Sequence, residues 1–143
     1  MGTYQHILIA VDLTDDSHTV AAKSVELARQ WGATVRLLHV VEFVPIEPMS
    51  DALVPVVQID EQVVERAQQQ IRALAAAVGL PADHCRVTSG NVKAEVLRYA
   101  RELNADLIVL GSRERHGLSI LVNLTEDTVL HGAPCDLLAI RVR

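Results

Sequence analysis

The chain has 143 residues, of which half are hydrophobic and 22% are charged, and this suits one compact domain over residues 1–143. A net charge of −5 argues against a broad basic surface for nucleic acid or anionic lipid, and an aromatic content of 3% leaves few rings on which bases could stack. No apolar run approaches the ~18 residues of a membrane-spanning helix. The opening MGTYQHILIAVD has no signal-peptide pattern, so we expect a cytoplasmic protein.

The first half of the chain alternates strand and helix patterns. HILIAV (6–11) is continuously apolar, as is typical of a central strand covered on both faces. Residues 17–31 have helical periodicity and Gly32 follows as a C-terminal cap, and TVRLLHVV (34–41) predicts a second strand. The acidic, proline-bearing residues 42–58 predict a long loop.

The same alternation continues in the second half. We expect helices over residues 60–78, 92–103 and 123–130, and strands over residues 84–88, 106–111 and 136–141. Gly79 closes the first of these helices, Ser89 and Gly90 predict a turn, and Asn91 is the expected cap of the helix that follows.

Five strands and four helices in alternation predict an α/β fold with a doubly wound parallel sheet, because right-handed crossovers leave few arrangements. The commonest strand order for this number is 3-2-1-4-5. Ligands of such sheets lie outside the carboxyl ends of the strands, where the strand order reverses. That point falls between Val11–Asp12, which end the first strand, and Gly111–Ser112, which end the fourth.

Other polar residues suggest structural roles. Cys85 and Cys135 have no metal or redox spacing and are expected to be reduced, half-buried thiols. His39 lies in an apolar strand, where a buried histidine with a hydrogen-bond partner is expected rather than a catalytic one. Asp12 is open to two interpretations: a ligand contact, or an Asx turn that leads into the next helix, with Thr14, Asp15 and Ser17 competing for the helix cap.

Four stretches resemble the universal stress protein family: HILIAVDLTDDS (6–17), LLHVV (37–41), VTSGNVKAEVLRYARELNADLIVLGSR (87–113) and HGAPCDLLAIRVR (131–143). The resemblance covers the whole chain. It implies a flavodoxin-like (Rossmann-like) domain that pairs as a homodimer through the final strand. It also implies a small cytoplasmic protein with a role in stress response or protection, for which an unidentified protein client is possible.

Nucleotide-binding members of that family have a glycine, two residues, a glycine, nine residues, and then Gly-Ser or Gly-Thr. The matching residues here are Gly111, Glu114, Leu124 and Thr125, so two of the three glycines are replaced. The resemblance also implies that Asp12 matches a ribose-binding aspartate and that Val41 matches a position beside the adenine. The candidate nucleotide residues are therefore Asp12, Val41, Gly111, Ser112, Arg113, Gly117 and Thr125.

The replacements of glycine by Glu114 and Leu124 disfavour phosphate binding. Glycine allows positive φ and lets backbone N–H groups approach a phosphate, which Leu124 prevents. A Glu114 carboxylate ~4 Å from a phosphate oxygen would cost about 4 kcal/mol near a protein surface. Glu126 and Asp127 add carboxylates to the first turn of the next helix. Arg113 and Arg115 could pair with Glu114 or with a ligand's phosphates, although a solvated charge cluster is the simpler interpretation.

Together with the resemblance, these replacements predict a non-catalytic dimeric stress protein that needs no cofactor and has no metal site. The alternative is an ATP-binding switch that uses magnesium and hydrolyses slowly, because Asp12, Val41, Gly111 and Thr125 are kept. A flavin carrier is disfavoured by the stretch DLTDD (12–16) after the first strand, which lacks a hydroxyl- and glycine-rich phosphate loop. The final strand, LLAIR (137–141), should lie at an apolar sheet edge, which a second copy of the chain would cover.

Overall fold

The computed structural model describes residues 3–42, 61–113 and 132–142. These residues form β1 (His6–Ala10), α1 (Ser17–Trp31), β2 (Thr34–Glu42), α2 (Glu61–Ala77), the 3-10 helix η1 (Ala82–His84), β3 (Cys85–Gly90), α3 (Val92–Glu102), β4 (Leu107–Arg113) and β5 (Asp136–Val142). All neighbouring strands are parallel and the order is β3-β2-β1-β4-β5. The predicted fold class and strand order are confirmed. Three of the four predicted α-helices lie in the described residues, and the fourth, 123–130, lies outside them.

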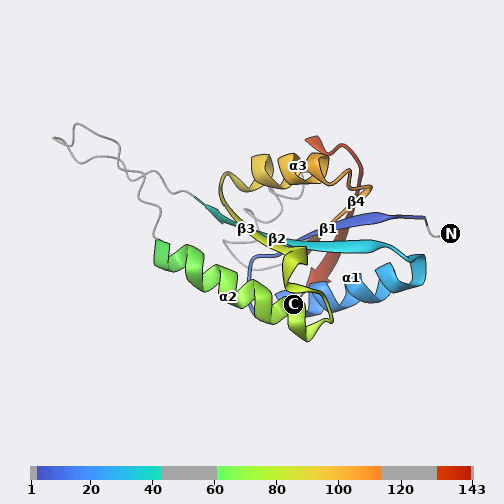
Figure 1. Cartoon of the computed structure of the whole chain (residues 1–143). Coiled ribbons are helices and arrows are strands. Elements are labelled where there is room, and N and C mark those ends of the chain that lie inside the picture. Colours follow the sequence, from blue (N-terminus) through green and yellow to red (C-terminus); the bar gives the residue numbers. More distant parts are fainter. Residues whose placement is uncertain (1–2, 43–60, 114–131, 143) are drawn as a thin grey trace.

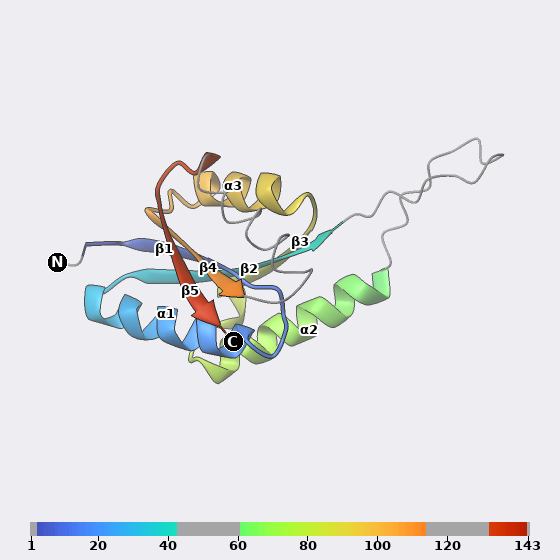
Figure 2. The ribbon, with the colours of Figure 1, turned by 180° about the vertical axis from the view of Figure 1, so that it is seen from behind.

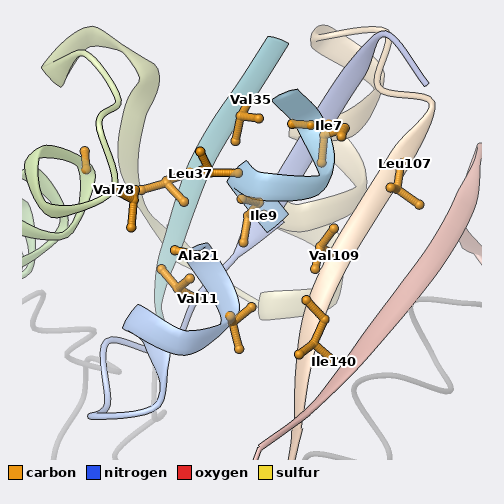
Figure 3. Close-up of a cluster of buried hydrophobic side chains, with 14 of the residues drawn as sticks. Ile7, Ile9, Val11, Ala21, Val35, Leu37, Val78, Leu107, Val109 and Ile140 are labelled. Carbon is orange, nitrogen blue, oxygen red and sulfur yellow. The ribbon is translucent and has the colours of Figure 1, made fainter. Parts of the chain in front are cut away.

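The sheet has helices on both faces: α1 and α2 lie on one face and α3 lies on the other (Figure 1; seen from behind in Figure 2). Ile7 and Ile9 pack with apolar residues of α1 and α2 (Figure 3), whereas Leu8 between them packs with α3. All three are at most 2% exposed. Burial on both faces explains why this strand is continuously apolar instead of alternating.

Local signals placed the helix ends correctly. Gly32 has φ +66° and its N–H donates to the carbonyls of Ala28 and Arg29, so it is the left-handed cap predicted for α1. Gly79, after α2, has φ +79°. The side chain of Asn91 accepts a hydrogen bond from the N–H of Ala94 and caps α3 as predicted.

All five strands differ from the prediction by one or two residues at an end, and β3 and β4 differ most. His84 belongs to η1, and β3 continues through Ser89 and Gly90, where we predicted a turn. β4 continues past Gly111 to Arg113. The extensions of β3 and β4 arise from pairing with a neighbouring strand: Gly90 pairs with Glu42, and Arg113 pairs with Val142. Strand length is set by the partner strand, which lies far away in the sequence.

Candidate functional site

β1 ends earlier than the strands on either side of it. Ala10 pairs with both Leu38 and Leu110, while β2 runs on to Glu42 and β4 runs on to Arg113. The chain therefore leaves the sheet at Val11 and Asp12, between two longer strands. This is the reversal point of the strand order, which is the usual ligand position of a doubly wound sheet.

The Asp12 carboxylate organises the turn between β1 and α1. Its Oδ1 accepts hydrogen bonds from the Thr14 N–H at 3.0 Å, the Thr14 hydroxyl at 2.7 Å and the Ser17 hydroxyl at 3.0 Å. Leu13, inside the turn, has φ +59°, a conformation that non-glycine residues seldom adopt. The Asx turn that we considered for Asp12 is therefore present, and it leaves the carboxylate in a defined position at the sheet edge.

The cap of α1 differs from the three candidates named from the sequence. The N-cap residue is Asp16, and its side chain makes no capping hydrogen bond to the helix. The hydroxyl of Ser17 bonds to Asp12 instead. The first turn of α1 is thus arranged around Asp12 and not around a side-chain cap.

His39 holds the end of β1 from the neighbouring strand. The N–H of Val11 donates to the carbonyl of Leu38 at 2.9 Å, and the carbonyl of Val11 accepts from Nδ1 of His39 at 2.8 Å. Both backbone groups of Val11 are therefore fixed by β2. His39 is a partly buried histidine with a hydrogen-bond partner, as predicted.

The other candidate residues of the sheet edge lie on β2 and β4. Val41 is half-buried and pairs with Ser89, and Gly111 is half-buried and pairs with Ile140. Ser112 and Arg113 are the last two residues of β4. The structure thus brings Asp12, Val41 and the Gly111–Arg113 segment to the same edge of the sheet. The candidates Gly117 and Thr125, and the replaced positions Glu114 and Leu124, lie outside the described residues.

Sequence reasoning missed how Ser17 and His39 act. It named Ser17 only as a possible helix cap and His39 only as a structural histidine. The available signal was their place near the carboxyl ends of two adjacent parallel strands, where side chains converge on the same edge. The hydrogen bonds themselves depend on the three-dimensional arrangement of β1, β2 and α1.

No metal site or membrane helix is found in the described residues. Within residues 3–42, 61–113 and 132–142, no group of three or more His, Cys, Asp or Glu side chains could hold a metal ion. None of the helices there is long and apolar enough to cross a membrane.

The two cysteines are free, half-buried thiols, as predicted. Burial raises the pKa of Cys135, and the neighbouring carboxylates of Asp136 and Asp106 raise it further. Burial also raises the pKa of Cys85, which Arg72 partly opposes. A raised thiol pKa disfavours the nucleophilic thiolate at neutral pH, so neither cysteine has the environment of a reactive one.

Comparison with known proteins identifies the family. A model of the Universal stress protein family matches residues 3–141. The chain belongs to this family. Universal stress protein A homolog 1 of Coxiella burnetii is 34% identical over 138 residues, which are 96% of each chain. Universal stress protein A homolog 2 of the same organism is 32% identical over 144 residues, covering 100% of this chain and 99% of that protein.

Solved structures of universal stress proteins share the fold. The protein UspA from Lactobacillus plantarum has a TM-score of 0.70 and 26% identity, over 99% of this chain and 100% of its own. A universal stress protein solved in complex with cAMP has a TM-score of 0.68 and 20% identity, over 97% and 98% of the two chains. The protein from Archaeoglobus fulgidus, solved in complex with dAMP, has a TM-score of 0.63 and 19% identity, over 96% and 98%.

Proposed function

We propose that this universal stress protein is a non-catalytic cytoplasmic homodimer with a role in stress response or protection. We also propose that it does not bind ATP through residues 111–125. The observation that supports this most directly is that Gly111, Ser112 and Arg113 are extended strand residues paired with β5. A phosphate loop instead needs turns that aim several N–H groups at one point. The replacement of two family glycines by Glu114 and Leu124 supports the same conclusion.

Isothermal titration of the purified protein with ATP and magnesium tests this proposal. We expect no binding in the micromolar range, and a clear micromolar Kd would refute the proposal. The variant Glu114→Gly/Leu124→Gly should then gain affinity, because it restores the glycine positions of the family motif and removes a negative charge. If the ATP affinity of the variant were unchanged, these two replacements would not be the cause of the weak binding.

A nucleotide-binding role is the second candidate. The hydrogen-bonded Asp12 turn favours it, because the carboxylate has a defined position at the edge where doubly wound sheets bind ligands. The cAMP and dAMP complexes of two proteins with this fold also favour it. Both of those ligands lack a triphosphate. An adenine nucleotide could therefore bind here by its nucleoside part, or ATP with magnesium could act as a switch if Arg113 and Gly117 offset the lost glycines.

The homodimer proposal is supported by the position of β5 at one edge of the described sheet. Leu137 and Leu138 are half-buried and Ala139 is exposed, which is an apolar edge that a second copy could cover. Ile140, in contrast, is only 8% exposed and belongs to the core. A charge at position 140 would therefore unfold the protein instead of testing the interface.

Ala139→Asp is the better probe of the interface. If β5 pairs with its counterpart, this charge is repeated across the two-fold axis and should shift sedimentation toward monomer. Ala73→Asp is the matched control, because Ala73 is also exposed but lies on α2. If the Ala139→Asp variant remains as fully dimeric as the Ala73→Asp variant, an interface through β5 is refuted.

A further inference from the structure

Tyr4 connects two elements that are far apart in the sequence. Its hydroxyl donates a hydrogen bond of 2.8 Å to Oδ2 of Asp136, the first residue of β5 and 132 positions away. Its ring packs edge-to-face on Trp31, the last residue of α1, with 5.1 Å between the ring centroids and 62° between the planes. One side chain therefore joins the end of α1 to the start of β5.

The backbone beside Tyr4 is itself held on two sides. Both oxygens of the Asp106 carboxylate accept backbone hydrogen bonds, from the N–H of Gln5 at 2.8 Å and from that of His6 at 2.9 Å. The carbonyl of Gln5 accepts from the N–H of Thr34, the first residue of β2, at 2.8 Å. The carbonyl of His6 accepts from the N–H of Asp106 at 2.9 Å. The Tyr4 hydroxyl therefore acts from a fixed position in the sheet.

The start of β5 has few other attachments. Among the described residues, β5 is an edge strand that pairs with β4 alone. Every residue from 133 to 139 is half-buried or exposed, and Ile140 is the first buried residue, at 8%. The core thus holds β5 at Ile140, while Tyr4 holds it at Asp136. A strand end with few buried contacts opens locally more easily than the centre of a sheet.

Opening of β5 from its start would uncover an apolar part of β4. Residues 107–110 of β4 are at most 5% exposed, and they pair with residues 136–139 of β5. An uncovered apolar strand has free N–H and carbonyl groups, and it pairs readily with other chains. The attachment of β5 at Asp136 therefore decides how well β4 stays covered.

We propose that Tyr4 is a latch: its bond to Asp136 keeps the start of β5 on the sheet and so keeps β4 from pairing with other chains. When this bond breaks, β5 opens from its start while the rest of the sheet stays folded. The latch requires neither nucleotide binding nor a homodimer, because all of its contacts lie within one chain.

The opposite edge strand offers a matched control. The start of β3 has its own tie, since Nη1 of Arg36, on β2, donates to the carbonyl of Asp83 in η1 at 3.1 Å. Arg36→Met removes that bond, whereas Tyr4→Phe removes only the hydroxyl and keeps the ring beside Trp31. Tyr99→Phe removes the hydroxyl of the second tyrosine of the chain, which lies on α3.

Amide hydrogen exchange of these variants tests the latch. We expect Tyr4→Phe to speed exchange in β5 by about three- to tenfold, the loss of one exposed hydrogen bond to a carboxylate, and to leave β3 unchanged. Arg36→Met should speed exchange in β3 and leave β5 unchanged, and Tyr99→Phe should leave β5 unchanged. Low concentrations of urea should speed exchange in β5 less than in β1, because local opening exposes less surface than global unfolding.

Four results would each overturn the latch: unchanged exchange of β5 in Tyr4→Phe, an equal increase in β3, an equal effect of Tyr99→Phe, or equal urea dependences of β5 and β1. Light scattering below the unfolding temperature tests whether the latch protects β4. Tyr4→Phe should associate faster than Tyr99→Phe at equal concentration, and equal rates would overturn the protection of β4.

Ultraviolet titration tests separately whether the Tyr4–Asp136 bond forms in solution. In Tyr99→Phe, Tyr4 is the one remaining tyrosine, and its hydrogen bond to Asp136 and the charge of that carboxylate should hold its pKa above the usual value of a phenol. In Tyr99→Phe/Asp136→Ala the pKa of Tyr4 should fall toward that usual value. If Asp136→Ala leaves the pKa of Tyr4 unchanged, the bond is absent and the latch is refuted.

Discussion

Arg29, in the last turn of α1, lies against Gly79, the residue that closes α2. The Nη2 atom of Arg29 is 3.2 Å from the position that a Cβ on Gly79 would occupy. A cation near the carboxyl end of a helix is favourable, because the last carbonyl groups there have partial negative charge. This contact packs the ends of two helices that lie on the same face of the sheet.

Gly79→Ala and Gly32→Ala should both destabilise the protein, because each glycine has a left-handed φ, +79° and +66°. An alanine Cβ costs roughly 1–2 kcal/mol in this conformation. The space around Gly32 is open, whereas Gly79 has Arg29 beside it. We therefore expect a slightly larger loss in Gly79→Ala, measured as the free energy of unfolding in urea.

An Arg29→Ala background separates the two contributions to the Gly79 effect. In that background Gly79→Ala should no longer lower the free energy of unfolding more than Gly32→Ala does. The loss of stability that the two variants share should remain. If Gly79→Ala were as stable as the wild type, the left-handed conformation at that position would be wrong.

His39→Leu should destabilise the end of β1. The Val11 carbonyl would lose the Nδ1–H donor that lies 2.8 Å away, and an unpaired buried carbonyl costs about 1–3 kcal/mol. His39→Asn should recover part of this loss, since its amide N–H₂ occupies a similar position to Nδ1. Urea denaturation measures the stabilities, and equal values for His39→Leu and the wild type would exclude a contribution from this bond.

Thr88→Val should stabilise the protein. The Thr88 hydroxyl oxygen is buried and has no hydrogen-bond partner among the residues that the structure describes. Thr88 lies on β3, where a β-branched valine of the same shape is favourable. Removing the desolvated hydroxyl should raise the free energy of unfolding by about 1 kcal/mol. Thr34→Val, at an exposed position of β2, is the control and should change the free energy of unfolding by less than about 0.5 kcal/mol. A loss of stability in Thr88→Val would mean that the hydroxyl has a partner.

Asp136→Asn should make Cys135 more reactive. The Asp136 carboxylate is one cause of the raised pKa of Cys135, so a neutral amide should lower that pKa and increase the thiolate fraction at a given pH. Labelling by a thiol reagent in a Cys85→Ser background measures the rate. The rate of the parent should rise as the pH rises above the usual pKa of cysteine, and that of Asp136→Asn should rise at lower pH.

The same raised pKa predicts the sign of a stability change with pH. The folded thiol keeps its proton after the unfolded thiol has lost it. Its contribution to stability is therefore complete below the unfolded pKa and is lost as the pH rises from that value toward the folded pKa. The contribution should be absent in a Cys135→Ser variant, which has no thiol to titrate.

The amino-acid sequence by itself determined the fold class, the strand order and most helix ends. Each of these depends either on a few neighbouring residues or on the small number of topologies that the connection rules allow. A continuous apolar run identified β1 as a central strand, Gly32 and Asn91 marked helix ends through their own backbone and side-chain preferences, and right-handed crossovers restricted the topology. The topology placed Asp12 and Gly111 at a common edge, because parallel strands end there, whereas Val41 was named from the resemblance to the family.

Only the tertiary structure decided which side chains act on that edge and where the strands stop. Gly90 and Arg113 belong to strands because Glu42 and Val142 pair with them, and Ile140 is buried because β5 packs onto the core. Ser17 and His39 reach Asp12 and Val11 through hydrogen bonds of 3.0 and 2.8 Å. Hydrogen bonds form only within a narrow range of distance and angle, and the relative placement of a strand and the helix that follows it is set by packing of the whole core.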